Sequence, residues 1–241
     1  PADALRLIDA GAATGVPGVL VTLTAIEGTS SRAVGTQMAV LADGRHVGSF
    51  SGGCIERAIV AEAIEVLAEG ASRTVRYGAG SPYIDVRLPC GGGIDLLFTP
   101  RPDLALVREA LARLDRREPA TLRLGEHVQC YTPAPRLIVF GHGEDLLALV
   151  RLARAYGLTV DAFAPDDGQD LDAGIVRMAT RERLPEVTGD PWSAVVFVFH
   201  DRDWEEFLLP QALGLDGFYH GAVGSRRTHA ARLAMLQRAG V

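Results

Sequence analysis

The stretch Arg136-Leu137-Ile138-Val139-Phe140-Gly141-His142-Gly143-Glu144 decides the fold of the second half of the chain. Its apolar run, 136–140, predicts a short buried strand that stops at two glycines spaced as G-x-G. A helical pattern follows over 144–156, and a second apolar run over 158–163 predicts another strand. This order of strand, helix and strand is typical of a doubly wound sheet of parallel strands.

The domain boundary is expected at Thr132-Pro133-Ala134-Pro135, where two prolines interrupt the regular patterns. Residues 134–241 are then a Rossmann-like, doubly wound parallel-sheet domain, and residues 1–133 are a mixed α/β domain, so the fold class is α/β. In the first domain the expected helices are 2–14, one that follows Cys54 and ends at Gly70, and 103–115, and the expected strands are 19–26, 36–41, 45–50, 73–77, 83–88, 96–98, 121–124 and 127–131. In the second domain the remaining strands are 194–199 and 218–223, and the remaining helices are 204–213 and 227–239.

One turn organises the first domain, Ser49-Phe50-Ser51-Gly52-Gly53-Cys54-Ile55-Glu56-Arg57. A strand enters two glycines, which have no Cβ to keep a ligand from the backbone, and a helix leaves. The free N–H groups at a helix start attract an anion and favour a thiolate, here that of Cys54. The turn therefore predicts an anion site with a reactive sulfur. The alternative interpretation is a tight turn with a buried cysteine.

A second turn repeats this chemistry in mirrored order, because Cys90 directly precedes Gly91-Gly92-Gly93. Consecutive glycines are entropically unfavourable and are typical of places where the backbone closely approaches another group. The loop 27–35 adds hydroxyls and Arg32, which suit an oxyanion. An ordinary surface loop is the alternative interpretation of residues 27–35.

Polar residues are expected at the carboxyl ends of the parallel strands, where open α/β sheets bind ligands. Arg226 and Arg227 begin the last helix and suit an anion, or they are simply solvated there. His200 is either a proton carrier or ligand, or a side chain that bonds the nearby backbone. The dinucleotide fingerprint is incomplete, since Leu146 takes the place of the third glycine, and this argues against NAD(P) binding.

The composition excludes several classes of protein. The chain has 241 residues, is 48% hydrophobic and 22% charged, and has a net charge of −6, so it has no basic surface for nucleic acid. No apolar run is long enough to span a membrane. Three cysteines are too few for a disulfide framework and fit a reducing, cytoplasmic setting.

Three groups of motifs resemble the XdhC/CoxI family, the maturation factors of xanthine dehydrogenase and related molybdenum hydroxylases. They are Gly28-Thr29-Ser30-Ser31-Arg32 with Gly35 and Ser51-Gly52-Gly53-Cys54-Ile55-Glu56, Leu88-Pro89-Cys90-Gly91-Gly92-Gly93, and His200-Asp201 with Gly221-Ala222-Val223-Gly224-Ser225-Arg226-Arg227-Thr228-His229. The resemblance covers nearly the whole chain. It implies an N-terminal XdhC domain, residues 1–133, and a Rossmann-like domain, residues 134–241.

The resemblance implies a non-catalytic chaperone that binds molybdenum cofactor, holds it while a cysteine desulfurase installs its terminal sulfur, and passes it to the apo-enzyme. Soft thiolates near the metal would come from Cys54 and Cys90, which are the candidate molybdenum contacts. The residues expected to bind the cofactor are Ser30, Arg32, Ser51, Gly52, Gly53, Cys54, Glu56, Cys90, Gly91, Gly92, His200, Asp201, Ser225 and Arg226.

The sequence also departs from the family pattern. Ser31 replaces the usual proline, and the usual histidine is absent at Glu144 while one appears at His142. Two other functions stay open: an NAD(P)-dependent oxidoreductase that uses the Rossmann-like domain, and a scaffold that docks the client enzyme without touching the cofactor. A homodimer is a candidate assembly because symmetric pairs are the commonest oligomers.

Overall fold

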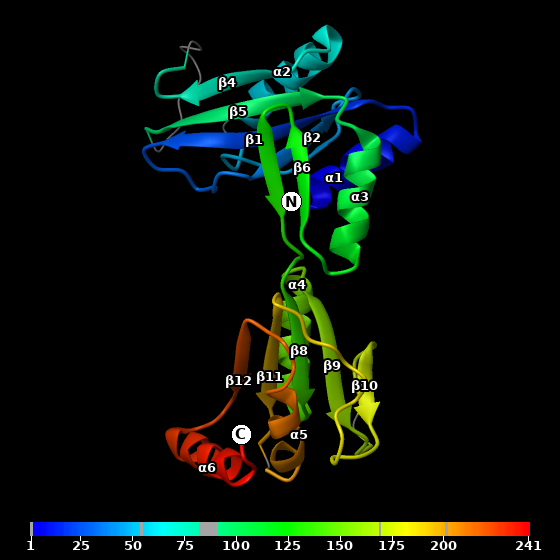
Figure 1. Cartoon of the computed structure of the whole chain (residues 1–241), viewed down its shortest axis with the longest axis vertical. Coiled ribbons are helices and arrows are strands. Elements are labelled where there is room, and N and C mark those ends of the chain that lie inside the picture. The colour runs from blue at the N-terminus through cyan, green and yellow to red at the C-terminus, as the bar shows by residue number, and fades with distance from the viewer. Residues whose placement is uncertain (1, 54, 82–90, 169, 201) are drawn as a thin grey trace. The chain divides into compact units, whose positions relative to one another are not determined.

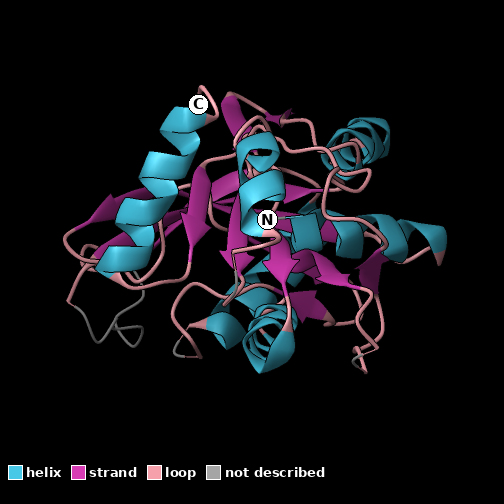
Figure 2. Cartoon of the chain, turned by 90° about the horizontal axis from the view of Figure 1, so that it is seen from below, coloured by secondary structure: helices cyan, strands magenta, loops and turns pink. Residues whose placement is uncertain are grey.

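The computed structural model describes residues 2–53, 55–81, 91–168, 170–200 and 202–241. It divides into two compact units, Pro1–Pro133 and Ala134–Val241, and each has its own sheet and hydrophobic core (Figure 1). Both units combine helices, in cyan, with strands, in magenta (Figure 2). No helix in the described part of the chain is long and apolar enough to cross a membrane.

The N-terminal unit is built on a five-stranded antiparallel sheet with the order β3-β2-β1-β5-β4. A separate two-stranded hairpin, β6-β7, confirms the predicted pair of short strands. The elements are α1 (Ala2–Ala13), β1 (Gly18–Glu27), β2 (Gln37–Leu41), β3 (His46–Val47), α2 (Glu56–Glu69), β4 (Arg73–Gly78), β5 (Gly93–Pro100), α3 (Leu104–Asp115), β6 (Ala120–Leu124) and β7 (His127–Tyr131).

Alternation along β1 divides the core of this unit into two layers. Val19, Val21 and Leu23 pack on one face against α2, through side chains such as Ile59 and Val66. Leu20 faces the other way, into a cluster that holds α1, α3 and the hairpin. The sheet is therefore covered on both faces, and its strand ends are left to carry loops.

The C-terminal unit is a five-stranded sheet with the order β10-β9-β8-β11-β12, and all its pairs are parallel. The predicted doubly wound topology is confirmed, because β8 lies in the middle and the chain winds outward to both edges. The elements are β8 (Arg136–Gly141), α4 (Gly143–Ala155), β9 (Thr159–Pro165), β10 (Ile175–Met178), β11 (Ser193–Val198), α5 (Glu205–Ala212), β12 (Tyr219–Ala222) and α6 (Arg226–Arg238).

Helices cover the two faces of the parallel sheet unequally. On one face α4 packs on Leu137 and Val139 of β8. On the other face α5 covers a row of aromatic rings, in which Phe140 stacks on Phe163 and on Phe197 at 5.1 Å between ring centroids in each pair. The described residues between β9 and β11 form no helix, so extended chain makes these two crossovers.

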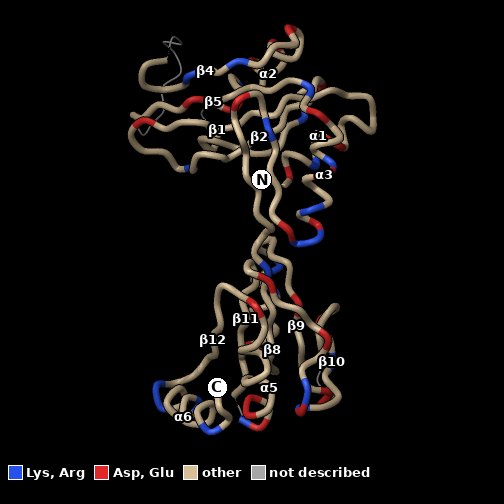
Figure 3. The backbone as a smooth tube through the Cα atoms, viewed as in Figure 1, with Lys and Arg blue, Asp and Glu red and all other residues tan. Residues whose placement is uncertain are grey.

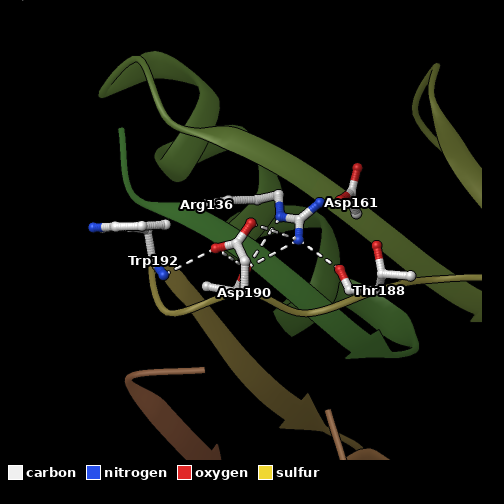
Figure 4. Close-up of polar contacts among 6 residues, drawn as sticks. Arg136, Asp161, Thr188, Asp190 and Trp192 are labelled. Atoms are coloured by element: carbon white, nitrogen blue, oxygen red, sulfur yellow. Dashed lines mark hydrogen bonds and ion pairs between the residues drawn. The ribbon is translucent and has the colours of Figure 1, made fainter. Parts of the chain in front are cut away.

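A partly buried arginine fixes the second of these crossovers to the sheet (Figure 4). Arg136, at the start of β8, donates to the carbonyl of Thr188 at 2.5 Å and to Oγ of Ser193 at 3.0 Å. Its guanidinium also lies 3.3 Å from carboxylate oxygens of Asp161 and Asp190. Asp190 in turn accepts from the N–H of Trp192 at 2.9 Å. The network thereby holds the segment before β11 against the amino end of β8.

The structure differs from the sequence-based elements in two places, and a third element is not among the described residues. The strand expected over 45–50 is only His46–Val47, because the chain turns at Gly48, where a Cβ would lie 2.5 Å from the carbonyl oxygen of Gln37. The edge strand β10 was not predicted. The strand expected over 83–88 lies outside the described residues.

Candidate functional site

Four loops meet at one end of the antiparallel sheet. β1 ends at Glu27 and β4 ends at Gly78, and both of these residues pair with Gly93, the first residue of β5. Since β3 runs in the same direction as β1, the turn that follows it reaches the same end. Ser31 Oγ donates to the carbonyl of Phe50 at 3.4 Å, which joins two of the loops directly. The fold therefore brings together the three N-terminal motifs that the sequence singled out.

The glycines of the 91–93 turn allow close backbone packing. A Cβ on Gly92 would lie 2.7 Å from the carbonyl oxygens of both Glu27 and Thr29, so no other residue fits there without movement. Ala79 N–H donates to the carbonyl of Gly92 at 3.0 Å. The sequence predicted a close approach at this turn, and at Gly92 the neighbour is the protein's own backbone. Gly91 has open space around it, with a φ of +69°.

The turn before α2 is organised by the carboxylate of Glu56. Its Oε1 accepts from the N–H of Phe50 at 3.0 Å, the N–H of Ser51 at 2.8 Å and the hydroxyl of Ser49 at 2.8 Å. Its Oε2 accepts from the N–H of Gly53 at 2.7 Å and the hydroxyl of Ser51 at 2.8 Å. The turn is an anion site, as predicted, but the anion in the structure is a side chain of the protein.

The hydrogen bonds keep Glu56 ionised. Burial alone would raise the pKa of Glu56, but bonds from the N–H and hydroxyl of Ser51 and from the hydroxyl of Ser49 outweigh it and lower the pKa far below its usual range. The N–H groups of Phe50, Ser51 and Gly53, in the turn before α2, therefore already bind a full negative charge. What remains open to solvent at this turn is the exposed backbone of Gly52 and Gly53, with no atom within 4 Å of a Cβ at either glycine.

Arg32 is an exposed cation at this end of the sheet. Its own N–H donates to Oγ of Ser30 at 3.1 Å, and its guanidinium has no ion pair among the described residues. The nearby Arg76 differs, because it is held by Glu27, by Asp95 at 3.1 Å and by the carbonyl of Ala79 at 2.7 Å. Arg32 is therefore available to an anionic ligand, whereas Arg76 is a structural residue.

The hairpin β6-β7 fixes the loop that carries Arg32. Gln129 donates from Nε2 to the carbonyl of Gly35 at 3.1 Å. The hydroxyl of Tyr131 donates to Gln37 at 2.8 Å, and Gln37 donates to Thr22 at 2.9 Å. Burial raises the pKa of Tyr131 to about 12, although the bond to Gln37 lowers it. The C-terminal end of the loop 27–35 is thereby connected to a chain of buried hydrogen bonds. The sequence did not indicate these contacts.

Cys54 and Cys90, the candidate molybdenum contacts, lie outside the described residues, and so does Asp201. The described sequence neighbours of the two cysteines, Gly53 and Gly91, belong to the loops at this end of the sheet. No group of three or more His, Cys, Asp or Glu side chains that could hold a metal ion occurs within the described ranges.

The candidate residues of the C-terminal unit lie at the carboxyl ends of its strands, as the topology predicts. His200 follows β11, and its Nε2 lies 2.7 Å from Oδ2 of Asp145 in the first turn of α4. Ser225 caps α6 by accepting from the N–H of Thr228 at 3.2 Å. Arg226 is exposed at the start of the same helix. This second group of candidates is therefore in a separate unit from the glycine loops.

The first glycine of the G-x-G turn after β8 allows two strands to pack closely. A Cβ on Gly141 would lie 2.3 Å from Cγ2 of Val198, so this glycine allows β8 and β11 to approach. Leu146 of α4, in place of the third glycine, is fully buried in the cluster that also holds Leu137 and Val139 of β8. Asp166, which directly follows β9, is paired with Arg177 at 3.3 Å.

Sequence reasoning missed one buried ion pair. Arg232 of α6 donates to Glu205 of α5 through Nε at 2.8 Å and through Nη2 at 2.5 Å, and both side chains are at most 5% exposed. Nη2 also donates to the carbonyl of Val223 at 2.6 Å. Arg232 is the residue of α6 that is buried, so this ion pair attaches α6 to α5. Glu205 begins α5 and Arg232 lies within α6, and neither position signals such a contact in the sequence.

Comparisons with known proteins agree over both units. Residues 12–78 match the family model of the XdhC and CoxI family, and residues 137–241 match that of the XdhC Rossmann domain. The chain is 34% identical to the molybdenum cofactor insertion chaperone PaoD of Escherichia coli, over 94% of this chain and 73% of that protein. A crystal structure described as a xanthine dehydrogenase of Bacillus halodurans is 23% identical to this chain and superposes with a TM-score of 0.76. The match covers 97% of this chain and 84% of the other chain, and it shows a shared fold. The chain belongs to the XdhC and CoxI family.

Proposed function

We propose that this protein is a molybdenum cofactor insertion chaperone. The identity of 34% to PaoD extends over 94% of the chain, so both units are included in the likeness. The observation that carries the proposal is the convergence of the glycine loops at one end of the N-terminal sheet. The two cysteines of the family motifs adjoin these loops in sequence.

The residues at this end of the sheet fit such a cofactor in two respects. Molybdenum cofactor carries a phosphate, and Arg32 is an exposed guanidinium without an ion pair in the described part of the chain. The cofactor also holds its metal through sulfur, for which thiolates of Cys54 and Cys90 are suitable neighbours. Because Glu56 fills the N–H groups before α2, the phosphate would bind on the Arg32 side rather than at the helix start.

The finer steps are part of the same proposal. The protein would shelter the cofactor, support its sulfuration by a cysteine desulfurase and pass it to an apo-enzyme of the xanthine dehydrogenase type in the cytoplasm. Bound cofactor supplies the redox chemistry of the client enzyme. The chaperone's own residues bind the phosphate and exclude water, and they hold no reacting substrate. A homodimer is the proposed assembly.

Co-expression tests the proposal directly. A candidate molybdenum hydroxylase is produced in cells that make the cofactor, with the wild-type chaperone, with the Arg32→Glu variant, and without either. We expect active, molybdenum-containing hydroxylase with the wild type, and less with Arg32→Glu. Arg45→Glu is the matched control, since Arg45 is another exposed loop arginine of the same unit and its side chain bonds Asp43. Equal hydroxylase activity and molybdenum content in all four cultures would refute the chaperone function.

A further inference from the structure

The hairpin β6-β7 carries two polar side chains that are almost fully buried. Gln129 is 6% exposed and Tyr131 is 1% exposed, and they alternate along β7, so both lie on one face of the strand. Burial of a polar group is unfavourable unless the group finds a hydrogen-bonding partner. The hairpin lies between the two segments that match the family models, 12–78 and 137–241, so the family likeness assigns these side chains no role.

Both ends of the side-chain amide of Gln129 are hydrogen-bonded. Its Nε2 donates to the carbonyl of Gly35 and to the carbonyl of Cys130, at 3.1 Å in each case. Because a carbonyl oxygen can only accept, these contacts identify the nitrogen end of the amide, and Oε1 accepts from Nε2 of His127 at 3.3 Å. A carboxylate in this place would face two carbonyl oxygens without a proton to donate.

Gly35 is the residue at which the hairpin holds the loop that carries Arg32. Its carbonyl accepts from Gln129, and its N–H donates to a carbonyl of β1 at 2.8 Å. Its φ of +90° favours glycine, and a Cβ would lie 3.1 Å from Nε2 of Gln129. A turn connects this residue to the cation, because the N–H of Thr36 donates at 3.1 Å to the carbonyl of Ala33, which directly follows Arg32.

A second contact fixes the strand that follows the loop. The hydroxyl of Tyr131 donates to Gln37, the first residue of β2, at 2.8 Å, and Gln37 donates to Thr22 of β1 at 2.9 Å. The three side chains are at most 5% exposed. The charged residues of the unit, blue and red in Figure 3, take no part in this chain of bonds, so salt should not weaken it.

We propose that Gln129 and Tyr131 are positioning residues of the cofactor site, which hold the loop 27–35 in the conformation that presents Arg32 to the phosphate. The inference rests on the proposed function, because it concerns the same site. Neither side chain contacts the cofactor in this arrangement. They act on binding because a loop that is ordered in advance loses less conformational entropy when its arginine binds a ligand. The beginning of the loop already packs closely on Gly92, so the hairpin completes its support.

Hydrogen exchange of the full chain tests whether the hairpin holds the loop. Gln129→Met keeps the length of the side chain and removes its donors. We expect the amides of Gly35 and Thr36 to exchange roughly fivefold faster in this variant, because the loop loses one hydrogen bond. Leu122→Val is the control, because Leu122 lies opposite Gln129 in the hairpin, is 2% exposed and has no polar group to bond the loop. It is expected to lower the unfolding temperature without faster exchange at Gly35.

Cofactor affinity then separates positioning from stability alone. The dissociation constant of molybdenum cofactor is measured for the wild type, for Arg32→Ala, for Gln129→Met and Tyr131→Phe, and for each of the last two combined with Arg32→Ala. Loss of a residue that acts through Arg32 is expected to raise the dissociation constant roughly fivefold when Arg32 is present, and by less than about twofold when it is absent. Equal factors with and without Arg32 would overturn the positioning role.

Two further outcomes distinguish this role from the proposed function. A wild type that binds no cofactor would overturn the proposed function and the positioning role with it. A wild type that binds cofactor, together with unchanged exchange at Gly35 in Gln129→Met, would overturn the positioning role and leave the proposed function intact.

Discussion

The carboxylate of Glu56 accepts hydrogen bonds at 2.8 Å from both the backbone N–H and the hydroxyl of Ser51. The charge that a ligand was expected to bring to this turn is thus built into the chain. A preformed turn loses little entropy when a ligand binds beside it, which suits a protein that must hold and then release a cofactor.

Removal of the Glu56 charge should destabilise the N-terminal unit. In Glu56→Gln the amide can accept only at one atom, and several N–H and hydroxyl groups lose their charged acceptor. We expect a loss of about 1–2 kcal/mol in the free energy of unfolding, since bonds to charged groups contribute about 1.5–3 kcal/mol and this site is half exposed. Urea denaturation measures it. Glu109→Gln, at an exposed site on α3, is the control, and equal losses in the two variants would refute this role of Glu56.

The same contact predicts a pH dependence of stability. Because the pKa of Glu56 is lower in the folded state than its ordinary value of 4.5, the unfolded state binds the proton more readily. The stabilisation from Glu56 is therefore complete above about pH 5 and is lost as the pH falls further. The difference in unfolding free energy between wild type and Glu56→Gln should be constant near neutral pH and should shrink in acid. A difference that does not change between pH 7 and pH 3 would contradict the assignment.

Gly92 should tolerate no side chain. In Gly92→Ala the new Cβ would lie 2.7 Å from two backbone carbonyl oxygens, so the 27–29 and 91–93 segments must separate. We expect loss of stability and weaker cofactor retention, because the loops of the site are displaced. Gly91→Ala is the control: unlike Gly92, Gly91 has a φ of +69° that is unfavourable for alanine, but its surroundings are open. Thermal unfolding that is lowered more by Gly91→Ala than by Gly92→Ala would refute the packing argument.

The Arg232–Glu205 pair should hold α6 to the C-terminal unit. Removal of one partner, as in Arg232→Met, leaves a buried carboxylate unpaired and should reduce the unfolding free energy by about 3–5 kcal/mol. Hydrogen exchange should show α6 losing protection before the parallel sheet. Adding Glu205→Leu removes the unpaired charge and should recover part of the loss. Arg238→Met, an exposed change in the same helix, should have little effect, and comparable exchange in both single variants would argue against the pair.

The sequence predicted the helices and strands well where the apolar period was clear. The apolar runs 136–140 and 19–26 predicted central strands of the two sheets, because a buried strand reads as a local apolar run. The edge strand β10 is four residues long and half exposed, so it left little pattern.

The site was predicted less completely, for physical reasons. The glycines and the helix start of the turn 49–57 predicted that the turn binds an anion. They did not predict that this anion is the carboxylate of Glu56. The position of Glu56 is the one available signal, since a glutamate at the start of a helix can reach back to N–H groups of the turn before it. The contacts of Arg136 and Arg232 join residues up to 57 positions apart, and such pairings depend on topology rather than on local sequence.

The central claim is that the loop end of the N-terminal sheet binds molybdenum cofactor. The most direct measurement is the molybdenum and pterin content of protein purified from cofactor-producing cells, compared between wild type and Cys54→Ala/Cys90→Ala. Cys130→Ala is the control, because Cys130 is exposed on β7 outside these loops. We predict retained cofactor in the wild type and in the control, and little in the double variant. A wild type that purifies without cofactor, or a double variant that retains as much as the control, would contradict the account.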